Sequence, residues 1–120
     1  MKKRIDSFKY AFRGIAEGFR GQVNIKIQLV AATLAISMAF FFELRTGKFC
    51  IILLCCGAVI SLELMNTAIE KLCDMIEPNK NDKIKSIKDI SAAAVLVASI
   101  ISLIVGLMIF APKVMQLIQS

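Results

Sequence analysis

Hydrophobic residues recur at helical spacing along the first twenty residues of the chain. Their intervals of three and four residues predict an amphipathic helix over residues 5–22, because lysine, arginine and glutamate occupy its other faces. A short basic helix with an apolar stripe is typical of the membrane surface, although such a stripe also suits packing against a soluble core. The stripe consists of Ile5, Phe8, Phe12, Ile15 and Phe19.

Three longer apolar segments follow, each with a long run that contains no charged residue. A helix needs about 20 predominantly apolar residues to cross the hydrocarbon core of a bilayer, so these segments predict three transmembrane helices. Pro78 and Asn79 are expected to end the second of them. The expected spans are residues 27–43, 48–76 and 89–112.

The composition supports an integral membrane protein. Of 120 residues, 58% are hydrophobic, and the mean hydropathy is +0.73. A soluble domain of this size cannot bury so much apolar surface, so we expect one membrane domain over residues 1–120. The net charge of +6 does not indicate nucleic-acid binding, because the basic residues flank apolar runs. Anionic membrane lipids and phosphorylated ligands are the expected partners.

Lysine and arginine are distributed unevenly between the two ends of the predicted spans. They concentrate before the first span and in the polar segment 77–89, whereas the opposite side holds only Arg45, Lys48 and Lys113. The positive-inside rule therefore places the N-terminus and segment 77–89 in the cytoplasm and the C-terminus outside.

Two residue types narrow the chemistry. Histidine is absent, which removes the commonest general base and metal ligand. The four cysteines show no C-x-x-C spacing, so we expect them to be small buried side chains of one apolar helix. They are Cys50, Cys55, Cys56 and Cys73.

Polar residues interrupt the second span on one helical face: Glu63, Asn66, Thr67, Glu70 and Asp74. We expect Glu63 to lie inside the cytoplasmic leaflet, Glu70 at the interface and Asp74 just in the cytoplasm. An acid within the bilayer is costly and marks a functional site by default. The alternative for Glu63 is a protonated side chain that hydrogen-bonds between helices, and the interfacial acids also suit an ordinary solvated end.

Lys88 and Asp89 begin the third span, so the chain returns them to the same cytoplasmic interface. Acids one turn apart suit Mg²⁺, which takes one or two carboxylates together with phosphate oxygens, and lysine suits phosphate. Metal, acids and lysine together are the minimum that phosphoryl transfer requires. The tripeptide at residues 46–48, "TGK", is not a P-loop, because Phe42 occupies the position of the required first glycine.

The segments "LELMNTAIEKLCD" and "IKDISAAAV" resemble the small bacterial membrane kinases of the diacylglycerol kinase and undecaprenol kinase family. The pattern in that family is approximately E-x-x-N-[ST]-A-I-E-x-x-x-D, followed about a dozen residues later by K-D-x-x-[SA]-A-A-V. The resemblance covers nearly the whole chain and includes "YAFRGI" in the first helix. It implies a homotrimer of the bacterial inner or plasma membrane with active sites between subunits on the cytoplasmic side.

The resemblance also implies an activity and the residues that carry it. The enzyme would transfer phosphate from ATP, with Mg²⁺ as cofactor, to a lipid alcohol, either undecaprenol or diacylglycerol. Ala92 to Ala94 are closer to the undecaprenol branch. In the roles carried over, Glu63 is the general base, Asn66 its neighbour in the site, Glu70 a metal ligand, and Asp74, Lys88 and Asp89 face the nucleotide.

One part of the first span departs from the family pattern. That pattern often reads E-x-N-x-x-x-H, whereas this chain has "QVNIKIQ". Asn24 is kept and is expected to help position the site. Gln22 replaces an acid that helps to bind metal, so it would offer an amide oxygen without a charge, and Gln28 replaces the histidine.

Two other functions fit parts of the pattern. A small proton-coupled transporter would use Glu63 as an intramembrane proton carrier, but that class prefers an acid near the midplane and usually a fourth span. A non-catalytic assembly or regulatory protein is the other alternative, and Gln22 is the one feature that points to it.

Overall fold

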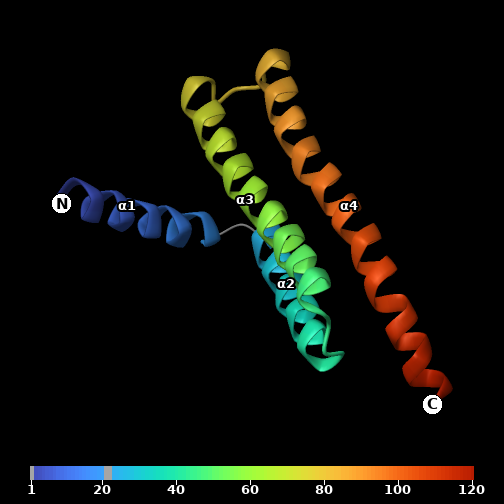
Figure 1. Ribbon diagram of the computed structural model, residues 1–120. Helices are drawn as coiled ribbons and strands as arrows, with labels where there is room; N and C mark the ends of the chain where they lie inside the picture. The colour runs from blue at the N-terminus through green and yellow to red at the C-terminus, as the bar shows by residue number, and fades with distance from the viewer. Residues whose placement is uncertain (1, 21–22) are drawn as a thin grey trace.

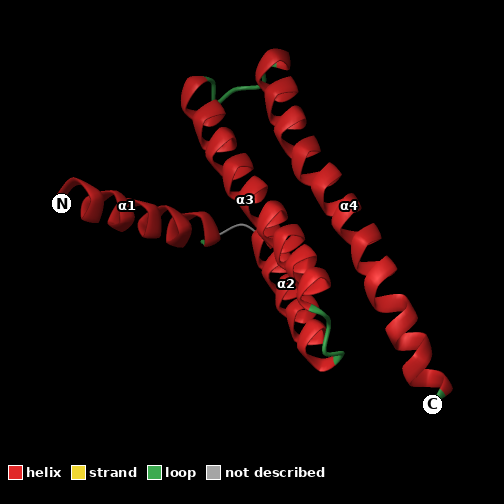
Figure 2. Ribbon diagram, in the orientation of Figure 1, coloured by secondary structure: helices red, strands yellow, loops and turns green. Residues whose placement is uncertain are grey.

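The computed structural model describes residues 2–20 and 23–120, and all regular structure in this part of the chain is α-helical (Figures 1 and 2). The all-helical fold class expected from the sequence is confirmed. The end of the predicted surface helix, at residues 21 and 22, lies outside the described residues. The helices are α1 (Lys2–Phe19), α2 (Val23–Phe41), α3 (Thr46–Ile76) and α4 (Asp82–Gln119).

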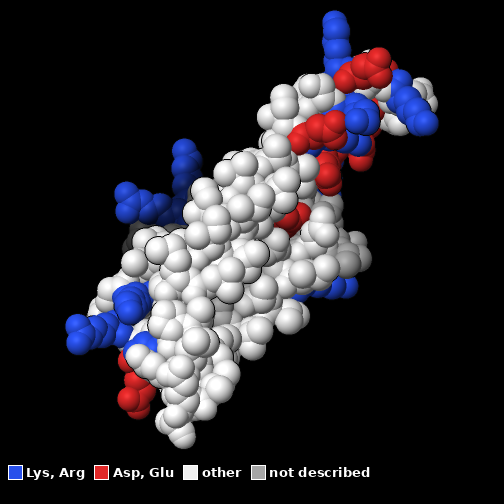
Figure 3. Space-filling view, turned by 90° about the vertical axis from the view of Figure 1, so that its right-hand side faces the viewer, with Lys and Arg blue, Asp and Glu red and all other residues white. Residues whose placement is uncertain are grey.

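The last three helices are each long and apolar enough to cross a membrane. A helix pairs its own backbone N–H and C=O groups, which is the requirement that the hydrocarbon core imposes on a single spanning segment. In Figure 3, charged side chains gather mainly towards the ends of the face shown, and a broad uncharged surface lies between them. This distribution is that of a bundle surrounded by lipid at its middle.

Helix α3 holds the bundle together, because it packs against both α2 and α4 and also contacts α1. A small apolar core lies towards the start of α3, where Ala39 of α2, Ile52 of α3 and Phe110 of α4 are buried together. Many other large apolar side chains are exposed, among them Leu54 at 73%. Lipid solvates such side chains, so membrane helices do not need to bury them against protein.

The exposure of the cysteines has the same explanation. Cys73 is buried as expected, but Cys50 is exposed, and Cys55 and Cys56 are half-buried. The expectation of buried cysteines is therefore wrong for Cys50, because a lipid-facing thiol loses nothing by remaining outside the protein core.

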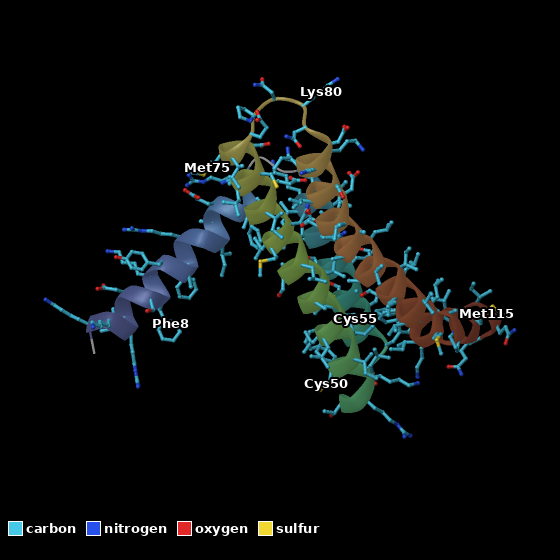
Figure 4. The ribbon with its side chains drawn as sticks, turned by 90° about the horizontal axis from the view of Figure 1, so that it is seen from above. Phe8, Cys50, Cys55, Met75, Lys80 and Met115 are labelled. Carbon is cyan, nitrogen blue, oxygen red and sulfur yellow. The ribbon has the colours of Figure 1, made fainter. Side chains whose placement is uncertain are left out.

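Helix α1 extends away from the three long helices, and this is visible in both Figure 1 and Figure 4, where Phe8 marks its outer part. Its apolar stripe is exposed, with Phe8 at 68% and Phe12 at 69%. Along α1, the buried residue is Gly18, near the C-terminal end. An exposed apolar stripe on a basic helix beside a membrane bundle suits a position in the headgroup region.

The connection between α3 and α4 is shorter than the polar segment 77–89 suggested. Helix α3 ends at Ile76, just before Pro78 as predicted, but α4 already begins at Asp82. The side chain of Asn81 caps α4 and accepts hydrogen bonds from the backbone N–H groups of Lys83 at 2.9 Å and Ile84 at 3.3 Å. Polar residues after such a cap continue a helix as well as apolar ones.

Helix α4 also extends beyond the expected span 89–112 at both ends. Its 38 residues correspond to about 57 Å at 1.5 Å per residue, whereas a bilayer with its headgroups is about 40–45 Å thick. The first turns of α4 therefore have the length to rise above the hydrocarbon, and Lys88 and Asp89 lie on helix rather than in a loop. Pro112 lies inside α4 without ending it.

We predict that Asn81→Ala destabilises the first turn of α4 by about 1 kcal/mol, because two backbone N–H groups lose their acceptor. Hydrogen exchange of the Lys83 and Ile84 amides in lipid nanodiscs should become faster. The matched control is Asn79→Ala in the same connection, where the backbone N–H and not the side chain bonds to Glu77. Equal exchange in both variants would contradict the cap.

Candidate active site

Three buried polar side chains lie together in the second half of α3. Glu63 is 2% exposed, Thr67 is 4% and Asn66 is 6%, and these are the polar side chains buried within the part of the chain that the structure describes. Their spacing of three and four residues puts them on one face of the helix. The polar face predicted from the sequence is therefore turned into the protein, as the cost of a carboxylate in lipid requires.

Two oxygens of this buried face have no hydrogen-bond partner among the described residues. They are Oε1 of Glu63 and Oδ1 of Asn66, while the Thr67 hydroxyl donates to the backbone oxygen of Glu63 at 3.0 Å. An unpaired buried acceptor costs about 1–3 kcal/mol. Two such acceptors on neighbouring turns form a site that a hydroxyl donor or a hard cation would satisfy.

A second cluster lies further towards the end of α3, at the connection to α4. Asp74 of α3 and Lys88 of α4 form an ion pair between their carboxylate oxygen Oδ1 and Nζ. Lys88 is partly covered, with 35% of its side chain exposed, and Asp74 is more open. The return of the chain to one interface, expected from the sequence, thus brings these two residues into contact.

Asp89 and Asn24 are less closely joined to this cluster. Asp89 pairs with Lys85 one turn earlier on α4, at 3.0 Å, and both side chains are exposed. Asn24 is exposed near the start of α2. Both residues are at the cytoplasmic ends of their helices on the predicted orientation, but the structure gives neither a contact with Glu63.

The predicted metal ligands are placed only in part. Glu70 is half-buried on α3, between the buried polar face and Asp74, and its charge acts on both Glu63 and Lys88. Gln22 lies outside the described residues. Residues 2–20 and 23–120 contain no group of three His, Cys, Asp or Glu side chains arranged to hold a metal ion.

Two cavities adjoin these clusters. A polar one of about 420 Å³ is lined by the α3–α4 connection together with Lys85 and Lys88, and Figure 4 shows Lys80 of that connection at the tip of the helix pair. An apolar one of about 630 Å³ lies between α2, α3 and α4. Its wall includes Val59, one turn from Glu63 along α3.

A hydrogen bond between α2 and α4 lies at the wall of the apolar cavity, and it was not predicted from the sequence. The Gln28 amide of α2 donates to the Ser99 hydroxyl of α4 at 3.4 Å, and both residues line the cavity. Gln28 was noticeable only as a replacement for histidine. Ser99 and Ser102 both lie in the apolar run of α4 and line the cavity. Which of them would pair with Gln28 depended on how α2 and α4 face each other.

Comparison with known proteins shows the family to which this chain is similar. The family described as prokaryotic diacylglycerol kinase matches residues 9–110. An undecaprenol kinase of Bacillus subtilis is 42% identical over 107 residues, covering 89% of this chain and 87% of that protein. A diacylglycerol kinase of Synechocystis is 32% identical over 112 residues, covering 92% of this chain and 64% of that protein.

The chain belongs to the prokaryotic diacylglycerol kinase family. Together with three helices able to cross a membrane, this membership makes it a membrane lipid kinase. A more distant member, a diacylglycerol kinase of Pseudomonas aeruginosa, is 26% identical over 98 residues, or 82% of this chain and 80% of that protein. The resemblance stated from the two motifs is confirmed.

The unpaired side-chain oxygen of Asn66 gives a prediction about stability. We expect Asn66→Leu to change the thermal stability of this family member in detergent only slightly. Removal of the unpaired oxygen, which costs about 1–3 kcal/mol, offsets the loss of the hydrogen bond between Asn66 and Glu63. Gln28→Leu is the contrasting variant and should lower the melting temperature, since it removes the hydrogen bond to Ser99 and leaves that hydroxyl unpaired. A fall in melting temperature for Asn66→Leu would mean that Asn66 is satisfied in the folded protein.

Proposed function

We propose that this enzyme transfers the γ-phosphate of ATP to the hydroxyl of a lipid alcohol at the cytoplasmic interface of the bacterial inner membrane. The observation that carries the proposal is the pair of unpaired buried oxygens on Glu63 and Asn66, on the same helix as Asp74, which contacts Lys88. An acceptor site for a hydroxyl thus lies on α3, and a cationic site for phosphate lies further along it, where Lys88 of α4 contacts Asp74. That order matches a lipid hydroxyl at headgroup depth and a nucleotide that arrives from the cytoplasm.

Glu63 is the general base in this proposal. Its carboxylate oxygen Oε1 accepts the proton of the lipid hydroxyl while the hydroxyl oxygen attacks the γ-phosphorus. The bond between the γ-phosphorus and the bridging oxygen of the β-phosphate breaks, and ADP leaves. The proton stays on the Glu63 carboxyl group until the phosphorylated lipid has left. Asn66, one turn away on the same buried face, helps to orient the hydroxyl. Asn24, at the start of α2, helps to position the substrate from the neighbouring helix. Holding the reacting groups in line is most of the catalysis in phosphoryl transfer.

Lys88, Asp74 and Asp89 form the nucleotide side of the site. The Lys88 ammonium has three donors, so it can remain paired with Asp74 and still donate to phosphate oxygens. The polar cavity of about 420 Å³ beside Lys88 lies within the size range of ligand pockets. Asp89, the next residue of α4, is exposed. In this proposal it contacts the ribose or base of ATP, because a carboxylate repels phosphate.

Glu70 and Gln22 would hold Mg²⁺, with the remaining ligands supplied by phosphate oxygens. Carboxylate and amide oxygens are the donors that this ion prefers, and Mg²⁺ needs only one or two protein carboxylates. When bound, the ion would neutralise charge that develops on the phosphate oxygens. Because Gln22 brings no charge, Glu70 would carry the electrostatic part of the binding.

We propose undecaprenol as the acceptor and a homotrimer as the assembly. The undecaprenol kinase of Bacillus subtilis shares more identity with this chain than the diacylglycerol kinase of Synechocystis does. The aligned region also covers a larger share of the Bacillus protein than of the Synechocystis protein. The apolar cavity one turn below Glu63 suits the hydrocarbon chain that follows the reacting hydroxyl. The homotrimer, with sites between subunits, follows from the family resemblance, and the N-in, C-out orientation follows from the positive-inside rule.

Glu63→Gln tests the base. We expect this variant to lose lipid phosphorylation by about 10²–10⁴-fold, because the amide cannot take up the hydroxyl proton, while it keeps its affinity for ATP. The control is Glu43→Gln, at the turn after α2 and far along the bundle from the site. Full activity of Glu63→Gln would exclude Glu63 as the base.

The acceptor is tested with purified protein in mixed micelles. We expect γ-labelled ATP to label undecaprenol in preference to diacylglycerol, and we expect EDTA to abolish labelling and added Mg²⁺ to restore it. Equal or stronger labelling of diacylglycerol would contradict the proposed acceptor. If neither lipid is labelled, the proposed reaction itself is wrong.

A further inference from the structure

Helix α1 touches the bundle through a glycine. Gly18 is buried near the end of α1, and a Cβ atom added to it would overlap Cδ2 of Leu64 on α3. The absence of a side chain at this position therefore permits the close approach of the two helices. Leu64 directly follows Glu63 in the sequence, so this contact lies on the turn of α3 that carries the proposed base.

A second contact lies beside the first. Glu17 of α1 and Lys71 of α3 form an ion pair at 3.7 Å. With 73% and 61% of their side chains exposed, this pair contributes little by itself. The ion pair does show where α1 lies on α3. Leu64 and Lys71 are two turns apart, so the end of α1 crosses these two turns. The same turns carry Glu63, Asn66 and Glu70 on a neighbouring face.

We propose that Gly18 is a positioning residue. Because it has no side chain, α1 packs directly against Leu64, and this contact fixes the position of α1 along the membrane normal relative to Glu63. This inference rests on the proposed kinase function. Helix α1 has the basic and apolar faces of a helix that lies among lipid headgroups, which is where a lipid alcohol presents its hydroxyl. A fixed depth of α1 on α3 therefore fixes how a lipid held against α1 meets the Glu63 carboxylate.

The test replaces Gly18 by a residue too large for the contact. Rotation of Leu64 can absorb a single methyl group, because the overlapping atom is the end of a flexible side chain, so the variant is Gly18→Leu. The matched control is Gly14→Leu, one turn earlier on α1, where an added Cβ atom meets nothing within 4 Å. Both variants remove a helical glycine, so they change the helix propensity of α1 in the same way.

Kinetics of lipid phosphorylation in nanodiscs are the first measurement. For Gly18→Leu we expect kcat/KM for the lipid to fall by about 10–100-fold, as for a misplaced substrate, with the KM for ATP unchanged. A double variant adds Leu64→Ala to Gly18→Leu. It should recover most of the lost activity, because the smaller side chain at residue 64 leaves room for the introduced leucine. Because Gly14 lies in the "YAFRGI" segment of the family resemblance, its kinetic control is the absence of rescue: Leu64→Ala should restore nothing in Gly14→Leu.

Hydrogen exchange across residues 15–20 in the same nanodiscs is a readout that does not depend on activity. Docking of α1 predicts faster exchange in Gly18→Leu, recovery in the double variant and no change in Gly14→Leu. Faster exchange with unchanged lipid kinetics would overturn the positioning role, and unchanged exchange would overturn the contact itself. Failure of the proposed kinase function would instead appear as a wild-type protein that phosphorylates neither lipid.

Discussion

The free energy needed to place a carboxylate in hydrocarbon governs this structure. Glu63 lies within a helix able to cross the membrane, so its side chain must face protein rather than lipid. That requirement fixes the rotation of α3 about its axis, and the rotation turns Asn66 and Thr67 inward with Glu63 while large apolar side chains such as Leu54 face outward. The orientation of the whole bundle around α3 follows from one side chain.

This constraint also explains why so few residues are buried. In water, apolar surface drives helices together, whereas lipid solvates leucine and isoleucine as well as protein does. The described helices therefore meet through limited contacts: a small core around Ile52 and Phe110, the Gln28–Ser99 hydrogen bond and the Asp74–Lys88 ion pair. Polar pairs between helices carry much of the specificity that core packing provides in soluble proteins.

The sequence predicted most of the fold, because hydrophobic runs and helix-ending residues act locally. Pro78 marked the end of α3, and the polar spacing on α3 placed Glu63 on the buried face. The start of α4 was misjudged, because lysine-rich segments suit a loop and a solvated helix equally, and only the cap at Asn81 decides between them. The Gly18–Leu64 contact was not predictable either, since it depends on the angle at which α1 meets α3.

The short connection at residues 77–81 has a consequence for side reactions. Many soluble kinases exclude water by closing a lid over the nucleotide, which prevents transfer of the phosphate to water. Among the described residues, this connection is the only loop beside Lys88, and it is tied to helix ends on both sides. Protection against wasteful ATP hydrolysis would then come from the bilayer, which keeps water away from Glu63 and admits chiefly a lipid hydroxyl as nucleophile.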